Sequence, residues 1–521
     1  MGSVADAAAS TDTPGVHRTI PTLFRAAVDD GGDRPWLTTD SGTLTFAEAQ
    51  HRIGRAATWL RAHDVGPDDR VLQTASNRPE HLLLWLALME VGAVQLPVNP
   101  RSTGAELAGM VGQSRPALLV ADAALLDDLT RARDEVGLTS PVVVVDELFA
   151  VEPDGRGPAD RAPEDVAVMI PTSGTTGRSK LVMQTHLSYV MAGEGFPFWT
   201  GITGDDRLMT SLPLFHVNAP AYSTLGSVAA RAGLVLLPGF SASRFLDDAR
   251  RFGATQFNSI GAMLELLVRQ PERPDDADTP LRLCYTGPSP TRERHLEIER
   301  RFGIEVVCGY GMSESTYGLF WARGTRPYGA LGSARQHPTL GHVNDARVRD
   351  VGADGVGELE LRNPATMRGY FEMPEETEAV LVDGWLRTGD LVTDDGEGVF
   401  TFVGRKKEVI RRRGENLSPT EVEVALDSHP DVAESAVVGV ESDLSEQDVK
   451  AFVVPTPGHP VDLADVDRHA RALLARFKVP RYYEVVDDLP HTPTGRLAKH
   501  RLPLERTGAE VDMEQDGRRD R

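Results

Sequence analysis

The hydrophobic positions in the first four-fifths of the chain follow two alternating periodicities. Residues 44–65 (LTFAEAQHRIGRAATWLRAHDV) and 80–93 (EHLLLWLALMEVGA) have apolar side chains at helical spacing. Residues 70–76 (RVLQTAS) and 93–100 (AVQLPVNP) predict strands, the second closed by proline. The strand signal recurs in six further apolar runs: PALLVAD, PVVVVDE, DRLMTSLPL, GLVLLPG, LRLCYTG and IEVVCGYG. This alternation predicts an α/β domain of parallel or mixed sheets covered by helices on both faces.

The pattern changes near residue 350. Three short runs, VGELELRN, GWLRTGD and VFTFVGR, predict antiparallel strands joined by turns that contain Gly and Asp. A basic stretch then precedes SPTE, which predicts a helix start with Ser418 as N-cap, Pro419 at the first position and Glu421 three residues after the cap. The remaining residues suffice for a small α+β domain. We therefore predict an N-terminal domain over residues 1–404 and a mobile C-terminal domain over 405–521.

Composition narrows the classes of function. With 40% hydrophobic and 25% charged residues, the chain is typical of a soluble globular protein. A formal net charge of −22 argues against a general nucleic-acid or membrane-surface binder, which needs a basic surface. Without an apolar run of membrane-span length or a targeting signal, a cytoplasmic location is expected. The two cysteines, Cys284 and Cys308, lack metal-ligand spacing and are predicted to be buried thiols.

The segment TSGTTGRSK, residues 172–180, follows the apolar run VAVMIP and combines glycines, hydroxyls and cations. Glycines allow close backbone approach and cations offset negative charge, which suits a polyphosphate. It is not a P-loop, because Gly177 is followed by Arg178 and Ser179, and an ordinary polar turn is the alternative. TGPSP (286–290) and GYGMSES (309–315) also follow strand candidates. We predict three loops that meet over one sheet edge.

Together these segments resemble the adenylate-forming superfamily of acyl- and aryl-CoA synthetases, peptide-synthetase adenylation domains and luciferases. Five segments occur in the family's order: TSGTTGRSK, GYGMSES, GWLRTGD, GRKKEVIRRRGENLSPTEVE and LPHTPTGRLAKHRL. The last two look most like those of carnitine/crotonobetaine-type acyl-CoA ligases. The phosphate loop departs from the family, since Ser179-Lys180-Leu181 replaces Pro-Lys-Gly and Pro171 replaces an aromatic residue.

The resemblance implies that ATP and Mg²⁺ bind to the N-terminal domain. Glu314 would be the magnesium ligand, Ser313 would contact the α-phosphate, and Tyr310 would stack on adenine opposite Gly287 and Pro288. The other implied nucleotide contacts are Thr172, Ser173, Gly174, Thr175, Thr176, Gly177, Lys180, Gly309 and Gly311. A solvated loop acid at 314 and a core tyrosine at 310 are the alternatives.

The C-terminal segments complete the implied site. Asp390 would accept the ribose hydroxyls and Arg405 would contact the ribose or the phosphates. Lys499 would stabilise charge at the α-phosphate during adenylation, Lys407 would be the domain hinge, and Gly414 would let pantetheine pass. Without the resemblance, the two lysines would be solvated charges.

The resemblance predicts an AMP-forming acid–thiol ligase that uses ATP, magnesium and coenzyme A. Amino-acid-activating relatives have Asp after the phenylalanine that matches Phe215, and His216 stands there instead. The substrate is therefore expected to be a non-amino-acid, hydrophobic acyl or aryl carboxylic acid, with apolar surface from residues 196–200, 259–267 and 316–324. His216 either orients the acyl carboxylate, acts as a lid or packs structurally. Transfer to a carrier protein, a separate thiolating enzyme or a nitrogen nucleophile, a non-catalytic nucleotide-binding paralogue, and a homodimer remain open.

Overall fold

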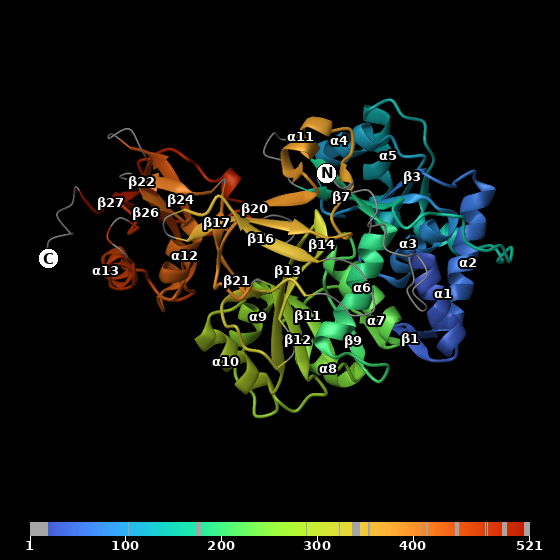
Figure 1. The fold of residues 1–521 in the computed structure, drawn as a ribbon, viewed down its shortest axis with the longest axis horizontal. Helices are drawn as coiled ribbons and strands as arrows, with labels where there is room; N and C mark the ends of the chain where they lie inside the picture. Colours follow the sequence, from blue (N-terminus) through green and yellow to red (C-terminus); the bar gives the residue numbers. More distant parts are fainter. Residues whose placement is uncertain are drawn as a thin grey trace, which may run out of the picture. The chain divides into compact units, whose positions relative to one another are not determined.

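The computed structural model describes residues 19–514 except 75, 103, 173–178, 288, 322–323, 336–343, 353–354, 407, 413–414, 443–446, 475, 477 and 492–496. The chain forms two compact units (Figure 1). The first comprises Met1–Arg347, Glu360–Arg387 and Gly396–Phe400, and the second comprises Val348–Leu359, Thr388–Asp395 and Thr401–Arg521. The domain boundary at residue 404 stays a prediction.

An eight-stranded sheet of the first unit has the order β14-β13-β12-β11-β9-β10-β1-β2. Its strands are β1 (Pro35–Thr39), β2 (Gly42–Thr45), β9 (Arg207–Thr210), β10 (Gly233–Leu236), β11 (Gln256–Ile260), β12 (Leu283–Gly287), β13 (Glu305–Met312) and β14 (Ser315–Phe320). The pairings from β13 to β1 are parallel, whereas the edge strands β14 and β2 are antiparallel to their neighbours.

A seven-stranded sheet has the order β18-β8-β7-β4-β3-β5-β6. Its strands are β3 (Arg70–Thr74), β4 (Val94–Val98), β5 (Leu118–Ala121), β6 (Val142–Val144), β7 (Val166–Thr172), β8 (Lys180–Thr185) and β18 (Gly369–Tyr370). Neighbouring strands from β7 to β6 in this order pair parallel, and β8 is antiparallel to both β7 and β18. Both sheets are therefore mixed, which is one of the two arrangements, parallel or mixed, that the sequence predicts.

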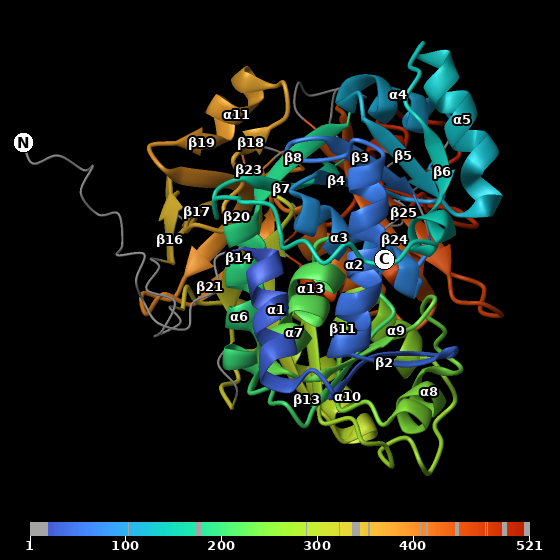
Figure 2. The same ribbon diagram turned by 90° about the vertical axis from the view of Figure 1, so that its right-hand side faces the viewer.

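The predicted helices form, with bounds set by their caps. Helix α2 (Phe46–Ala62) begins after a capping box in which Thr45 and Glu48 satisfy each other's backbone N–H groups. Helix α3 (Pro79–Val91) is buried over most of its surface and ends at Gly92 in the left-handed conformation. The others are α1 (Ile20–Gly31), α4 (Gly104–Ser114), α5 (Leu126–Glu135), α6 (His186–Thr200), α7 (Leu225–Ala230), α8 (Phe245–Phe252), α9 (Gly261–Val268), α10 (Arg292–Phe302) and α11 (Pro374–Val380). Figure 2 shows α5 beside β5 and β6.

A further sheet has the order β15-β21-β20-β17-β16, and β19 pairs with β20. Its strands are β15 (Ala330–Gly332), β16 (Asp345–Arg349), β17 (Val356–Arg362), β19 (Leu381–Val382), β20 (Trp385–Asp394) and β21 (Phe400–Arg405). The three short strands predicted after residue 350 correspond to β17, β20 and β21. The division between the two units falls within β16, β17, β20 and β21.

The second unit contains a four-stranded sheet with the order β24-β25-β26-β27. From residue 410 onward, the unit consists of β22 (Ile410–Arg412), β23 (Glu415–Leu417), α12 (Pro419–Asp427), β24 (Val432–Glu441), β25 (Gln447–Pro455), α13 (Leu463–Leu473), β26 (Tyr482–Val485) and β27 (Val511–Asp512). Strands β22 and β23 pair with each other in a separate two-stranded sheet. Helices α12 and α13 bury Val422, Leu426 and Val466 in the same hydrophobic cluster as β24 and β25. This is the small α+β fold that the sequence predicts.

Three local predictions are wrong. GYGMSES is not a loop, because β13 continues to Met312 and turns into β14 at Ser315. The three proposed loops do not leave one sheet edge, because β7 belongs to the seven-stranded sheet and β12 and β13 belong to the eight-stranded sheet. Ser418 occupies the N-cap position of α12, but its side chain makes no capping hydrogen bond.

Two general predictions remain, one on the cysteines and one on membrane-spanning helices. Cys284 and Cys308 are buried, unpaired thiols on neighbouring strands. Within the part of the chain that the structure describes, no helix combines the length and apolar character that a membrane crossing requires.

Candidate active site

The segment proposed to hold phosphates is the connection of a β-hairpin. Strands β7 and β8 pair antiparallel, with Thr172 opposite Lys180. The Thr172 hydroxyl donates to the Lys180 carbonyl at 3.4 Å, which closes the base of the connection. Ser173, Gly174, Thr175, Thr176 and Gly177 lie outside the described residues, so the structure positions only the two ends of this segment.

Tyr370 links the two charged residues proposed for phosphate and metal. Strand β18 pairs with β8 so that Tyr370 stands opposite Val182, two residues from Lys180. The Lys180 ammonium lies 4.3 Å from the centre of the Tyr370 ring, a cation–π contact. The Tyr370 hydroxyl donates to Oε1 of Glu314 at 3.0 Å. No pattern in the sequence singled out Tyr370.

Burial and the neighbouring Glu314 carboxylate both raise the pKa of Tyr370 above its ordinary value. The tyrosine side chain therefore stays a neutral hydroxyl that donates to the carboxylate throughout the pH range in which enzymes work. Tyr370 is 6% exposed, so this hydrogen bond forms in a largely water-excluded position. We conclude that Tyr370 fixes the orientation of Glu314.

Glu314 lies in the turn between β13 and β14, and neighbouring segments hold that turn. Gln184 of β8 donates to the Ser313 carbonyl at 2.5 Å, and the Met367 N–H donates to the Glu314 carbonyl at 2.7 Å. These bonds bring Ser313 and Glu314 beside the strand that begins at Lys180. The turn and the hairpin therefore meet, although they come from different sheets.

This arrangement suits magnesium bound mainly by nucleotide phosphates. No group of three or more His, Cys, Asp or Glu side chains that could hold a metal occurs among the described residues. Mg²⁺ commonly uses one or two carboxylates together with phosphate oxygens and water. A single oriented carboxylate, Glu314, beside the lysine of a phosphate-binding segment fits that coordination chemistry.

The proposed adenine contacts gather at the ends of β12 and β13. These strands pair parallel, and a Cβ built on Gly287 would lie 2.8 Å from the Gly309 carbonyl oxygen. A Cβ on Gly311 would lie 2.8 Å from the Tyr222 hydroxyl. Close packing therefore favours glycine at both 287 and 311. Tyr310, which precedes Gly311, is half-buried, and its hydroxyl lies 3.6 Å from the sulfur of Met312. Pro288 lies outside the described residues.

The second unit holds the pair proposed for ribose. Arg405 Nε lies 2.9 Å from Oδ1 of Asp390, which is 1% exposed. The Asp390 N–H donates to the Thr388 hydroxyl at 3.1 Å, and that hydroxyl donates to the Leu359 carbonyl at 2.8 Å. The structure thus brings together Asp390, predicted to bind the ribose, and Arg405, predicted to contact the ribose or the phosphates, while Thr388 holds the backbone at Asp390.

Lys499 lies in a short 3₁₀ turn of the second unit and is ion-paired with two carboxylates. Its ammonium is 2.7 Å from Oε1 of Glu423 and 3.3 Å from Oε2 of Glu408. The proposed hinge Lys407 and the proposed pantetheine glycine Gly414 lie outside the described residues. Neither glutamate was singled out from the sequence.

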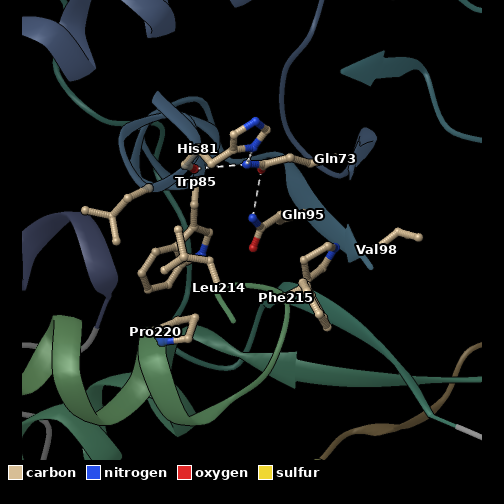
Figure 3. Close-up of a pocket in the computed structure, with 10 residues that line it drawn as sticks. Gln73, His81, Trp85, Gln95, Val98, Leu214, Phe215 and Pro220 are labelled. Atoms are coloured by element: carbon tan, nitrogen blue, oxygen red, sulfur yellow. Dashed lines mark hydrogen bonds between the residues drawn. The ribbon is translucent and has the colours of Figure 1, made fainter. Parts of the chain in front are cut away.

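Phe215, the residue before His216, lines a pocket that is partly open to solvent (Figure 3). Phe215 and Leu214 line it, facing Gln95 and Trp85 from the seven-stranded sheet and α3. Gln95 donates to the side-chain oxygen of Gln73 at 2.8 Å. The lining residues include none from the three segments predicted to contact an acyl group.

Those three segments contribute mainly to the core. Phe196 is 0% exposed, and Tyr317 and Phe320 lie in the same hydrophobic cluster. The half-buried His216 ring lies 4.6 Å from that of Phe215, measured between ring centroids. The structure therefore places His216 next to Phe215, which lines the pocket, and does not support an acyl-binding role for the three segments.

Comparisons with known proteins bear on this arrangement. The family described as "AMP-binding enzyme" matches residues 24–371, and "AMP-binding enzyme C-terminal domain" matches residues 421–496. The crotonobetaine/carnitine–CoA ligase of Salmonella typhimurium is 29% identical over 486 residues, covering 88% of this chain and 93% of that protein.

Two solved structures have the same fold. ATP-bound MatB from Rhodopseudomonas palustris is 30% identical with a TM-score of 0.83, covering 92% of this chain and 97% of that one. The o-succinylbenzoate CoA synthetase of Bacillus subtilis, in complex with its acyl-adenylate, is 26% identical with a TM-score of 0.82 and the same coverage. These similarities confirm the predicted family resemblance and the α/β fold class.

Proposed function

Because this chain belongs to the AMP-binding enzyme family and is an AMP-forming CoA-ligase-type enzyme, we propose that it joins a carboxylic acid to coenzyme A in two steps. In the first step a carboxylate oxygen attacks the α-phosphorus of ATP, and the bond to pyrophosphate breaks. In the second step the thiol sulfur attacks the acyl carbon, loses its proton and displaces AMP. The observation that carries the proposal is the Lys180–Tyr370–Glu314 cluster.

The first step mainly requires positioning and charge neutralisation. Lys180, with the Thr172–Gly177 segment, would hold the β- and γ-phosphates. Glu314, oriented by Tyr370, would supply the protein ligand to Mg²⁺, which when bound neutralises phosphate charge. The close approach of Gly287 and Gly309 supports an adenine site there, with Tyr310 stacking on the base.

The second unit would supply the remaining groups. Asp390, held beside Arg405, is a buried carboxylate that can accept both ribose hydroxyls. Lys499 would bring its positive charge to the α-phosphate and the attacking carboxylate. Rotation about Lys407 would then withdraw Lys499 and bring Gly414 to the pantetheine arm for the thiol step.

The acid is proposed to be a non-amino-acid acyl or aryl carboxylate. Phe215-His216 offers no carboxylate at the position where amino-acid-activating relatives have Asp, so an α-ammonium group would lack its counter-ion. His216 would orient the acyl carboxylate. The relatives named above act on crotonobetaine or carnitine and on o-succinylbenzoate, none of which is an α-amino acid.

The test is a panel of carboxylic acids assayed for pyrophosphate release and acyl-CoA formation, with and without coenzyme A. The proposal expects at least one non-amino acid to give AMP, pyrophosphate and thioester in equal amounts. Pyrophosphate release without thioester at saturating coenzyme A would instead support transfer to another acceptor. No pyrophosphate release with any acid would contradict the proposed function.

A further inference from the structure

Lys499, the lysine proposed to act in adenylation, is held within its own unit by two acidic side chains. Its ammonium is 2.7 Å from Glu423 and 3.3 Å from Glu408, and its side chain is only 14% exposed. These contacts lie entirely within the second unit. The second unit therefore holds the Lys499 side chain through its own residues.

The Glu423 contact is built into the fold. Glu423 lies on α12 with its side chain 12% exposed, and its Oε1 atom also accepts the Val437 N–H of β24 at 2.7 Å. The carboxylate is thus fixed by the backbone of a neighbouring strand. Surface ion pairs of long side chains contribute little, but a partly buried and immobilised carboxylate interacts more strongly with its counter-ion.

The charges of this cluster do not suit an adenylation site. The cluster of one ammonium and two carboxylates has a net charge of about −1. An α-phosphate that is attacked by a carboxylate needs a positive group beside it instead. Lys499 must therefore exchange Glu423 for the reacting anions before it can stabilise them. Burial holds the pKa of Glu423 above its ordinary value although Lys499 opposes the shift, so the charged carboxylate also depends on the lysine.

We propose that Glu423 is a positioning residue that holds the Lys499 ammonium within the second unit and sets the cost of releasing it for adenylation. The inference rests on the proposed function for the role of Lys499. Glu408 assists, at a longer distance and with a side chain that is 37% exposed. As a positioning residue, Glu423 would act on adenylation through Lys499, the cation that it contacts.

The first test measures amine labelling of the full-length protein by an N-hydroxysuccinimide ester, followed by peptide mass spectrometry. Glu423→Gln should increase the labelling rate of Lys499 by about 3- to 10-fold, the scale of coupling between contacting charges. Glu421→Gln is the matched control, since Glu421 lies on the same helix and pairs with Lys478 at 2.6 Å. That variant should increase labelling of Lys478 and leave Lys499 unchanged.

Lys450 reports whether the unit remains folded, because its side chain is 0% exposed and should stay unlabelled in every variant. If Lys450 is labelled in Glu423→Gln, the variant Glu408→Gln is used in its place. This second variant should give a smaller increase in the labelling rate of Lys499. Unchanged labelling of Lys499 in a folded variant would overturn the proposal.

The second test measures ATP–pyrophosphate exchange with an acid that the wild type accepts. Glu423→Gln should raise the adenylation rate about 3-fold or more, and the increase should vanish in a Lys499→Ala background. A fall in adenylation, or an increase that persists without Lys499, would overturn the proposal. If the wild type accepts no acid, the proposed function fails, while labelling still decides whether Glu423 holds Lys499.

Discussion

The hydroxyl of Tyr370 donates a 3.0 Å hydrogen bond to Oε1 of Glu314. The ring of the same tyrosine lies 4.3 Å from the ammonium of Lys180. One buried side chain therefore contacts both the carboxylate proposed for magnesium and the lysine proposed for phosphate. Because β18 pairs with β8, the register of these strands holds Tyr370 beside Lys180.

Tyr370→Phe should lower adenylation by about 10- to 100-fold, since hydrogen bonds to charged groups contribute about 1.5–3 kcal/mol. The phenylalanine ring keeps the contact with Lys180, so the loss should appear mainly in the dependence on magnesium–ATP concentration. The measurement is the initial rate of pyrophosphate release across magnesium concentrations with one accepted acid.

Two further variants separate the contacts of Tyr370. Tyr370→Leu should be worse than Tyr370→Phe, because it also removes the cation–π contact with Lys180. Tyr328→Phe is the matched control, since Tyr328 packs against His295 and Trp321 away from this cluster. If Tyr370→Phe behaves like Tyr328→Phe, the hydroxyl does not orient a catalytic carboxylate.

Glu314→Gln should reduce pyrophosphate release by about 100-fold or more, comparable to the loss of one preorganised electrostatic group. The amide keeps the size of the side chain and an oxygen that can accept from Tyr370, so folding should be preserved. The apparent affinity for magnesium–ATP should fall in the same assay. A near-normal rate would show that Glu314 is not the metal ligand.

Lys499→Ala should lower adenylation by several orders of magnitude while leaving thioester formation from supplied acyl-adenylate largely intact. The proposed two-pose cycle uses this lysine only in the first step. Both half-reactions are measured separately with the same acid, and Lys478→Ala on the same unit serves as control. Equal loss of both half-reactions would contradict the two-pose proposal.

The sequence predicts elements whose signals are local. Helix α2 forms where apolar residues have helical spacing, and its Thr45–Glu48 capping box is visible in the sequence. The parallel strands correspond to apolar runs between helices. The pairs Asp390–Arg405 and Lys180–Glu314 were assigned to one ligand only through the family resemblance.

The wrong local predictions have non-local causes. Four residues of GYGMSES lie in β13 although glycine disfavours strands, because this part of β13 pairs with β14. The hydroxyls of Tyr285 and Tyr222 fill the space that side chains at 309 and 311 would need, which explains the glycines there. Ser418 does not cap α12 because its side chain is buried against Gly404.

The missed residues depend on contacts that are distant in sequence. Strand β18 has only two residues, too few for a periodic pattern, yet its pairing with β8 brings Tyr370 beside Lys180. Glu423 reaches Lys499 through the packing of the second unit. An acidic residue in the first turn of a helix, such as Glu421, looked more informative in sequence, and it pairs with Lys478 instead.

The last prediction concerns acid sensitivity of the first unit and depends on His186, the first residue of α6. The side chain is 1% exposed, and its Nδ1 atom accepts the Ile20 N–H at 3.5 Å. Burial and, to a smaller extent, nearby Arg161 lower the pKa of His186 to about 4, with Asp165 opposing the shift. Its pKa in the unfolded chain is near 6.5, so the unfolded state binds the proton more strongly. The stability that His186 contributes is therefore complete above pH 6.5 and is lost as the pH falls toward 4.

His186→Asn keeps a side-chain acceptor and removes the titrating ring, so it should flatten this dependence. Between pH 6.5 and 4 the wild type should lose up to about 3 kcal/mol more unfolding free energy than the variant. The measurement is the denaturation midpoint of each protein across that pH range, with His51→Asn as the control on exposed α2 surface. Parallel pH profiles for wild type and His186→Asn would show that the buried imidazole does not carry the acid sensitivity.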